Sequence, residues 1–245
     1  MSSTQTKNDR LGYGFGRPAP SGPDAENRVV ASILAAIRDF RMRPGARLIE
    51  REIALASGAS RLSVRNALLR LADLGLVTLN RHRGATVAAC TRSDARATFE
   101  ARHVVETAIL RKLATSANDD TLERLLNFVD DERQAYAANR IIDARRLSRE
   151  FHLLLAELAG NRELAAFLKT LIDKQPLLSW SSEAAQGCFC GNAAHAEIVA
   201  AIGRREAEVA LAVNDAHLEE LERRLAAEEI PPSAPLPPAT AMGQE

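Results

Sequence analysis

The chain has 245 residues, of which 46% are apolar and 26% are charged. This length and apolar content allow one large or two small domains, each with a hydrophobic core. The sequence shows neither a signal-peptide pattern nor an apolar run long enough to cross a membrane. We therefore expect a soluble, cytoplasmic protein without a membrane partner, in which Cys90, Cys188 and Cys190 are reduced thiols.

The formal net charge of zero hides an asymmetry along the chain. Residues 1–92 carry 15 Lys+Arg and 7 Asp+Glu, whereas residues 93–245 carry 17 and 25. Only the N-terminal part has the positive charge that favours approach to a polyanion. Every basic residue from 28 to 92 is Arg, whose side chain suits guanine and phosphate, although genome composition explains an Arg bias equally well.

The two ends of the chain differ in composition from what lies between them. Residues 1–24 and 229–245 are rich in Gly, Pro and polar residues without a sustained period, which predicts disorder. From 26 to 41 apolar side chains recur with helical spacing. This pattern predicts an amphipathic first helix that is stopped by Pro44 and Gly45.

Residues 48–87 carry the most informative pattern of the chain. A helix, a Gly-containing turn, a second helix and a hairpin follow one another, which is the order of a winged helix-turn-helix. Ser60 is placed to cap the second helix and Gly75 to end it. The apolar face of that helix is formed at i, i+3, i+4 and i+7 by Val64, Ala67, Leu68 and Leu71. We therefore predict a DNA-binding domain over 25–92.

Positive charge is concentrated at two places in this predicted domain. Arg61 and Arg65 lie one helical turn apart near the start of the second helix, where a recognition helix meets base edges and phosphates. The predicted hairpin has Arg81-His82-Arg83 at its tip. Arg81 and Arg83 are suited to neutralise phosphates, whereas His82 is equally consistent with a groove contact and with a solvated turn.

Beyond residue 92 the strand signals end, and almost everything up to residue 228 has a helical pattern. We expect helices near 94–116, 120–138, 141–159, 162–180, 193–203 and 205–227. No period of about 20 to 50 residues recurs, which favours a compact antiparallel bundle over 93–228. The predicted fold class is mainly α, with an N-terminal winged helix-turn-helix followed by an all-helical antiparallel bundle.

Three of the five histidines fall on three different predicted helices, namely His152, His195 and His217. A bundle can bring three such helices around one cavity, and neutral imidazole is the commonest metal ligand. Three imidazoles suffice for zinc, or leave open positions on an octahedral metal. Histidines scattered over helices are also ordinary core or surface residues, so the residues alone leave both interpretations open.

The sequence resembles the GntR superfamily of bacterial transcription regulators, in the FadR-type branch that ends in a helical FCD ligand-binding domain. The resemblance covers roughly residues 26–227. Its N-terminal positions are Leu48-Ile49-Glu50-Arg51-Glu52, Ser60-Arg61, Val64-Arg65, Ala67-Leu68, Leu71, Gly75-Leu76-Val77 and Arg83-Gly84-Ala85. Its C-terminal positions are Glu100-Ala101-Arg102, Glu106, Phe151-His152, Gly160-Asn161, His195 and His217.

The resemblance implies a set of residues that contact DNA. The candidates are Arg51, Ser60, Arg61, Arg65, Asn66, Arg81, Arg83 and Gly84 of the wing. Two departures from the family pattern affect this set. Leu62 and Ser63 stand where a small polar residue and Pro are usual, and Asn66 stands where Glu is usual. Because Leu62 removes a hydroxyl contact and Asn66 adds an amide, we expect an operator that differs from the commonest ones.

The resemblance also implies a metal site in the bundle. FCD domains commonly hold a divalent metal through three histidines and an Asp one turn before the first of them. The histidines map onto His152, His195 and His217, whereas Ser148 occupies the Asp position. A hydroxyl is a poor ligand beside a carboxylate, so we expect weakened binding of an ion such as Zn, Ni or Mn.

Three residues are candidates for binding an effector: Arg102, Arg145 and Ser148. Arg102 matches the family's carboxylate-binding arginine, although a surface Arg102 would simply pair with Glu106 at i+4. Arg145 precedes Ser148 by three positions and lies on the same helical face. This favours an alternative in which charge holds an anionic effector with little or no metal, while a solvated Arg145 is the plainer interpretation.

These observations predict a homodimeric, ligand-responsive transcription regulator, most simply a repressor, that binds a palindromic double-stranded DNA operator. A small organic acid in the bundle would change its DNA affinity. One alternative is a metal-dependent enzyme that uses the three histidines, against which stand the missing carboxylate and the lack of a recognisable nucleophile. A second is a constitutive DNA-binding protein whose bundle serves only dimerisation.

Overall fold

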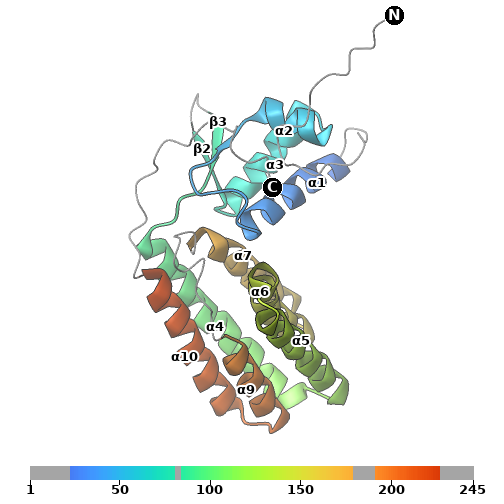
Figure 1. The fold of residues 1–245 in the computed structure, drawn as a ribbon, viewed down its shortest axis with the longest axis vertical. Helices are drawn as coiled ribbons and strands as arrows, with labels where there is room; N and C mark the ends of the chain where they lie inside the picture. The colour runs from blue at the N-terminus through green and yellow to red at the C-terminus, as the bar shows by residue number, and fades with distance from the viewer. Residues whose placement is uncertain (1–22, 81–83, 179–190, 227–245) are drawn as a thin grey trace, which may run out of the picture. The chain divides into compact units, whose positions relative to one another are not determined.

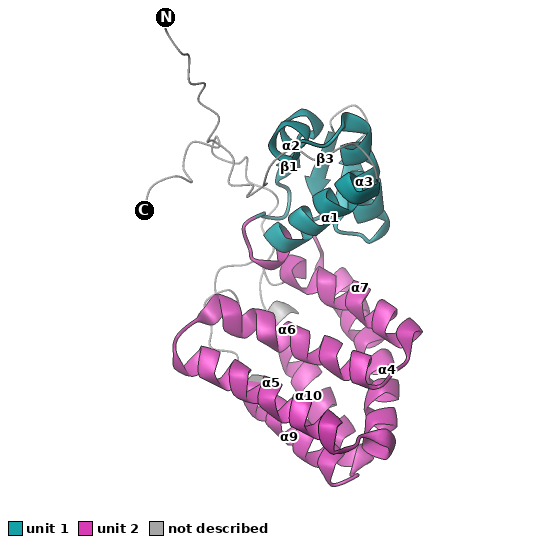
Figure 2. Cartoon of the chain, turned by 90° about the vertical axis from the view of Figure 1, so that its right-hand side faces the viewer, with its two compact units in different colours: residues 1–36, 42–88, 231–245 teal, residues 37–41, 89–230 magenta. Residues whose placement is uncertain are grey.

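A computed structural model describes residues 23–80, 84–178 and 191–226 (Figure 1). The chain divides into two compact units, coloured separately in Figure 2. The described part of the first unit is residues 23–36, 42–80 and 84–88, and that of the second is 37–41, 89–178 and 191–226. The predicted disordered ends lie almost wholly outside the described residues. The wing tip (residues 81–83), Cys188 and Cys190 also lie outside the described residues.

Helix α1 (Pro23–Arg38) begins three residues before its predicted start, and therefore inside the segment expected to be disordered. Pro23 needs no hydrogen-bond acceptor at the first helical position, and Asp24 and Glu26 lie near the positive end of the helix dipole. These signals precede the apolar stripe, which is why periodicity alone placed the start too late. The helix also ends earlier than residue 41, because Phe40 adopts a left-handed φ of 56°.

The helix-turn-helix is formed by α2 (Glu50–Ser57) and α3 (Arg61–Asp73). Gly58 ends α2 with a left-handed φ of 66°, a conformation that a side chain would strain. Ser60 caps α3, since its Oγ accepts a hydrogen bond from the backbone N–H of Ser63 at 3.1 Å. The predicted apolar face of α3 is confirmed as buried: Val64, Ala67, Leu68 and Leu71.

A three-stranded antiparallel sheet completes the first unit. The predicted hairpin consists of β2 (Val77–Asn80) and β3 (Gly84–Val87), with Asn80 opposite Gly84. A two-residue strand, β1 (Arg47–Leu48), pairs with the other edge of β3 and gives the order β1-β3-β2. Sequence analysis missed β1, because two residues are too few to show the alternation of a strand.

The second unit is an all-helical bundle, as predicted. Its described helices are α4 (Arg92–Ser116), α5 (Asp119–Ala137), α6 (Ile141–Leu158), α7 (Arg162–Leu178), α9 (Gly191–Gly203) and α10 (Ala207–Ala226). Each of these described helix boundaries lies within two residues of the predicted one. Among the described residues, no helix combines the length and the apolar character that crossing a membrane requires.

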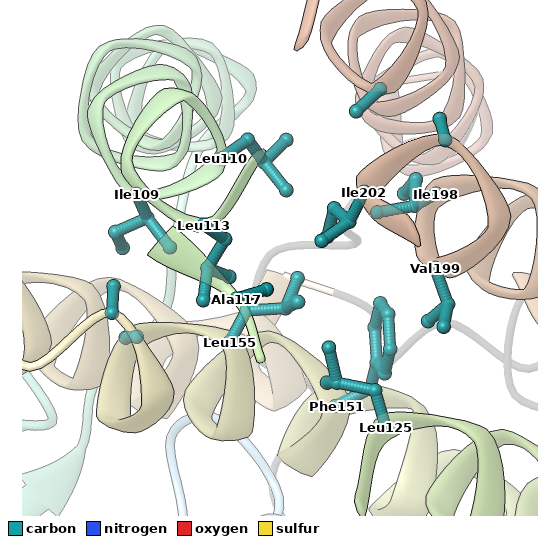
Figure 3. Packing of buried hydrophobic residues seen from close by; sticks show 14 of the residues in the cluster. Ile109, Leu110, Leu113, Ala117, Leu125, Phe151, Leu155, Ile198, Val199 and Ile202 are labelled. Atoms are coloured by element: carbon teal, nitrogen blue, oxygen red, sulfur yellow. The ribbon is translucent and has the colours of Figure 1, made fainter. Parts of the chain in front are cut away.

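Apolar side chains from all six described helices of the unit form the core of the bundle, and Figure 3 shows how those of α4, α5, α6 and α9 point toward one another. Ile109 and Leu113 come from α4, Leu125 from α5, Leu155 from α6 and Ile198 from α9. All five side chains are almost completely buried. Helix α10 packs against α4 and α9, which closes the bundle around a set of buried polar residues.

Candidate functional site

Four of the predicted DNA-contacting residues line one surface hollow of about 600 Å³ in the first unit: Arg51, Arg61, Arg65 and Gly84. The hollow lies where the start of α2, the first half of α3 and the β2–β3 hairpin meet. Arg47 of β1 adds a fourth guanidinium group to its lining. A concave, arginine-lined surface beside a recognition helix is suited to a phosphate backbone.

One of these arginines is held by a carboxylate that sequence analysis did not single out. Glu50 of α2 accepts two hydrogen bonds from Arg65, at 3.1 Å from Nε and 3.2 Å from Nη2. The hydrogen bond and the negative charge of Glu50 raise the pKa of Arg65. The two residues are 15 positions apart, so no helical spacing in the sequence indicated the pair.

The other residues predicted to contact DNA differ in how exposed they are and in whether the structure describes them. Ser60 is engaged as the cap of α3. Asn66 is half-buried, whereas Leu62 has 68% of its surface exposed at the second position of α3. Arg81 and Arg83 belong to the segment 81–83, which lies outside the described residues. The structure therefore describes the candidate DNA interface on α2, on α3 and on strands β2 and β3, but not at the tip of the wing.

In the second unit the structure brings the three predicted metal ligands together. His152 of α6, His195 of α9 and His217 of α10 are buried, and their nearest ligand nitrogens all lie within 4.8 Å of one another. The ring centroid of His195 is 5.1 Å from that of His152 and 4.9 Å from that of His217. Phe151 stacks on His195 at 4.2 Å and covers one side of the cluster.

Two carboxylates orient these imidazoles. Glu106 Oε2 lies 2.9 Å from His152 Nδ1, and Glu132 Oε2 lies 2.7 Å from His195 Nδ1. If each Nδ1 carries the proton, its carboxylate accepts the hydrogen bond and each Nε2 lone pair stays available, which is the arrangement of metal-binding histidines. Among the described residues, His195 Nε2 and His217 Nε2 are buried without a hydrogen-bond partner. These residues therefore fit a divalent metal.

The electrostatics of the cluster favour the same protonation state. Burial lowers the pKa of His152 to about 4, although Glu106 opposes the shift. Burial and the other two histidines lower the pKa of His217. Burial would raise the pKa of Glu106, but Arg102 and His152 hold it below its ordinary range. At neutral pH His152 and His217 are thus neutral imidazoles beside an ionised Glu106.

Arg102 joins this cluster from α4 and is only 1% exposed. Its Nε donates to Glu106 Oε1 at 2.8 Å, and its Nη1 donates to Gln175 Oε1 at 3.2 Å. Arg102 Nη2 is buried without a hydrogen-bond partner among the described residues. The ion pair with Glu106 was expected for a surface arginine, whereas the structure places the pair inside the bundle, where apolar neighbours exclude water.

The other two effector candidates lie on α6. Ser148 is half-buried one turn before His152, at the position that the spacing predicted. The guanidinium carbon of Arg145 lies 5.7 Å from the ring centroid of Phe40, and burial lowers the pKa of Arg145. A cation–π contact therefore describes Arg145 better than the solvated surface residue considered from the sequence.

Two further polar residues near the cluster were not anticipated, Glu132 and Asn214. Asn214 lies on α10 three positions before His217, is 1% exposed, and has no partner for its Oδ1 among the described residues. His217 also contributes to an open groove of about 730 Å³ between α9 and α10. The sequence signal for Asn214 was its i, i+3 spacing from a candidate ligand, which places both residues on one face.

A winged helix-turn-helix that presents arginines, joined to a helical domain with a buried polar cluster, defines a helix-turn-helix DNA-binding protein. Comparisons with known proteins specify the class further. Residues 25–87 match the bacterial regulatory proteins of the gntR family, and residues 97–220 match the FCD domain. The chain belongs to the gntR family and is a transcription regulator of the GntR/FCD type.

Relatives support this assignment. The HTH-type transcriptional repressor RspR of Escherichia coli K12 is 24% identical over 181 residues, which cover 73% of this chain and 78% of RspR. The repressor NanR of Cronobacter sakazakii is 29% identical over 191 residues, covering 70% of this chain and 73% of NanR. Because the family and these relatives are transcription regulators, the enzyme alternative is set aside.

Solved structures show the same fold. A GntR transcriptional regulator from Rhodococcus sp. RHA1 is similar with a TM-score of 0.75 and 25% identity, covering 84% of this chain and 99% of that one. McbR/YncC of Escherichia coli has a TM-score of 0.74 and 17% identity, covering 83% of this chain and 97% of its own. The second likeness is one of fold alone.

Proposed function

We propose that this regulator is a homodimeric repressor that binds a palindromic operator, and that a small organic acid bound in the FCD domain changes its DNA affinity. One recognition helix reads one half-site, so a two-fold dimer is the natural reader of a palindrome. The names of the relatives RspR and NanR support the repressor assignment. Arg51, Arg61 and Arg65 in one hollow support the DNA contact.

The observation that carries the effector part is the set of buried polar atoms without protein partners. Arg102 Nη2, His195 Nε2 and His217 Nε2 belong to this set among the described residues. A buried polar atom left unpaired costs about 1–3 kcal/mol, so a bound group that pairs them would be strongly favoured. A carboxylate meets the need of Arg102 Nη2, because it accepts hydrogen bonds from a guanidinium group, and a divalent metal would meet that of the Nε2 lone pairs.

The metal forms a separate part of the proposal. His152, His195 and His217 would hold a divalent ion such as Zn, Ni or Mn, with Glu106 and Glu132 orienting two of the rings. Such an ion supplies a positive charge with open positions for a carboxylate. Ser148 supplies no carboxylate ligand, so an effector held by Arg102 with little or no metal is the alternative that metal analysis of the purified protein decides.

The first experiment is a titration of the purified dimer against DNA from upstream of its own gene, at fixed salt with excess random competitor. Competitor-resistant binding that one member of a panel of sugar acids, hydroxy acids and dicarboxylates alters would support the proposal. Operator binding that no acid alters, without thermal stabilisation by any acid, would instead favour the constitutive DNA-binding protein. If the protein binds neither this DNA nor any other genomic sequence more tightly than random DNA, the proposal that it recognises an operator is wrong.

Substitutions can distinguish the arginines that read the operator sequence from those that bind phosphates of any DNA. Arg61→Ala and Arg65→Ala should reduce the preference for the operator, whereas Arg83→Ala should weaken all sequences similarly and lower the salt slope by about one. Arg70→Ala is the matched control, because Arg70 lies on α3 but pairs with Glu26 of α1. Equal losses on operator and random DNA for all three test variants would contradict this division.

A test of the effector-binding role of Arg102 needs a variant that keeps a positive charge beside the buried Glu106. Arg102→Lys retains a cation but cannot bind a carboxylate through two parallel N–H groups. We expect it to bind the operator normally and to lose most of the response to the acid. Arg96→Lys is the control on the same helix, since Arg96 is exposed and pairs with Glu100. An unchanged acid response in Arg102→Lys would contradict the assigned role.

A further inference from the structure

The recognition helix exposes a large apolar side chain where arginines dominate. Leu62 is the second residue of α3 and 68% exposed, and it lies between Arg61 and Arg65 in sequence. It does not belong to the buried face of α3, which is formed by Val64, Ala67, Leu68 and Leu71. A single exposed leucine is ordinary on a protein surface, so its meaning depends on its neighbours.

Those neighbours form two strips along α3. Residues three or four apart share a helix face, so Arg61 and Arg65 form a cationic strip that lines the hollow. Leu62 and Asn66 follow at i and i+4 and form a neutral strip beside it, whereas Leu69 lines the hollow together with the arginines. Leu69 is 44% exposed and Asn66 is half-buried. The helix therefore offers DNA both a charged edge and a neutral edge.

The cationic strip is partly fixed by the protein itself. The two hydrogen bonds from Arg65 to Glu50 occupy its Nε and one Nη2 proton, which leaves Nη1 and the outer edge for DNA. A guanidinium group held in this way loses less freedom on binding a guanine or a phosphate. Within α3, the side chains suited to A·T pairs are then those of the neutral strip, Leu62 and Asn66.

The chemistry of the major groove matches this pair of side chains. The 5-methyl group of thymine is the apolar feature of that groove, and apolar side chains contact it. Adenine presents N7 and N6–H₂, which a carboxamide matches with two hydrogen bonds. Leu62 and Asn66 are separated by one helical turn of about 5.4 Å, and stacked bases by about 3.4 Å. The two side chains can therefore reach base pairs that are one or two steps apart.

We propose that Leu62 contacts a thymine methyl group and Asn66 an adenine, so that each half-site contains A·T pairs beside the G·C or phosphate contacts of Arg61 and Arg65. This inference rests on the proposed operator binding and names the bases that the site selects. It assigns the recognition of A·T pairs to the neutral strip and leaves the G·C and phosphate contacts to the cationic strip.

The test begins with selection of DNA from a random pool by the full-length protein. The selected half-site is then synthesised with deoxyuridine in place of each thymine, which removes only the 5-methyl group. We expect one such replacement to weaken wild-type binding about fourfold, the effect of one buried methyl group. The Leu62→Ser variant, which carries no methyl group, should bind the two DNAs equally. Leu55→Ser is the control, since Leu55 is 72% exposed on α2.

The role of Asn66 is tested by 7-deazaadenine, which lacks the N7 acceptor. Replacement at one adenine should weaken wild-type binding about tenfold and leave the DNA affinity of the Asn66→Ala variant unchanged. An enriched site without A·T pairs near its conserved guanines, or a uracil effect unchanged in Leu62→Ser, would overturn the inference but not operator binding. Failure to enrich any sequence would overturn the operator binding itself, and the two failures are thus distinguishable.

Discussion

Oε2 of Glu132 lies 2.7 Å from Nδ1 of His195, and both side chains are completely buried. This pair joins α5 to α9 inside the bundle and fixes the orientation of the imidazole. A carboxylate that accepts a hydrogen bond from a ligating histidine raises the basicity of that histidine, and its loss typically lowers metal affinity by about 10- to 100-fold.

The Glu132→Gln variant should therefore bind Zn²⁺ or Mn²⁺ about 10- to 100-fold more weakly than the wild type. Glutamine keeps the size of the side chain but removes its charge. Competition against a fluorescent chelator measures the affinity, and circular dichroism without metal checks the fold. Glu123→Gln, an exposed position on the same helix, should leave the affinity unchanged. Equal affinities of wild type and Glu132→Gln would contradict the positioning role.

A carboxylate restored at residue 148 should have the opposite effect. Ser148 lies one turn before His152 on α6, so Ser148→Asp would place an anionic ligand on the same helix face. We expect divalent metal affinity to rise about tenfold or more, which corresponds to about 1.4 kcal/mol. Isothermal titration calorimetry measures this change, with Ser116→Asp on α4 as the exposed control. An unchanged affinity would mean that residue 148 does not face the metal.

Much of the fold could be predicted from the sequence, because its signals are local. The amphipathic spacing of α3 and the capping signal of Ser60 placed the recognition helix correctly. The strand β1 (Arg47–Leu48) was missed, since its existence depends on pairing with β3, which lies almost 40 residues further along the chain. Non-local pairing of this kind leaves no periodic trace in a two-residue segment.

The candidate site was predictable only as far as the resemblance identified its histidines. The partners of those histidines come from other helices, at sequence separations of 46 for Glu106 and His152 and 63 for Glu132 and His195. Glu132 was not singled out, because a charged residue on a helix usually faces solvent and no local spacing marked it. Burial of ionised groups is a property of packing, which single-sequence periodicity does not report.

The start of α4 yields a prediction on pH. Thr91 Oγ1 accepts from the backbone N–H of Asp94 at 3.2 Å, and Asp94 Oδ2 accepts from the N–H of Thr91 at 2.7 Å. The hydrogen bonds from Thr91 lower the pKa of Asp94. The stabilisation is therefore complete above the pKa of the unfolded chain, about 3.9, and is lost as the pH falls through the lower folded value.

We accordingly expect Asp94→Asn to destabilise the protein at pH 7 and to have little effect near pH 2. Thr91→Ala should cost about 1 kcal/mol at pH 7, because it removes the cap side chain of α4. Urea denaturation followed by circular dichroism at both pH values measures these changes. Ser93→Ala is the control in the same turn, where Ser93 is exposed. A pH-independent loss in Asp94→Asn would contradict the pKa argument.

Asn214 gives a prediction in which stability and binding oppose each other. Its Oδ1 is buried without a hydrogen-bond partner among the described residues, which costs the folded protein about 1–3 kcal/mol. Asn214→Leu keeps the number and branching of the side-chain heavy atoms and removes the unpaired acceptor. In chelator-treated protein we expect a higher urea midpoint for this variant. Asn127→Leu, at an exposed position on α5, controls for the better helix propensity of leucine.

In the presence of a divalent metal or an organic acid that binds the cluster, the order should reverse, because only the wild type offers Oδ1 to the bound group. The measurement is the shift of the thermal midpoint on adding Zn²⁺ or the effector, which reports binding to the folded state. We expect a smaller shift for Asn214→Leu than for the wild type and the Asn127→Leu control. Equal shifts in all three proteins would show that Asn214 is only a tolerated polar residue of the core.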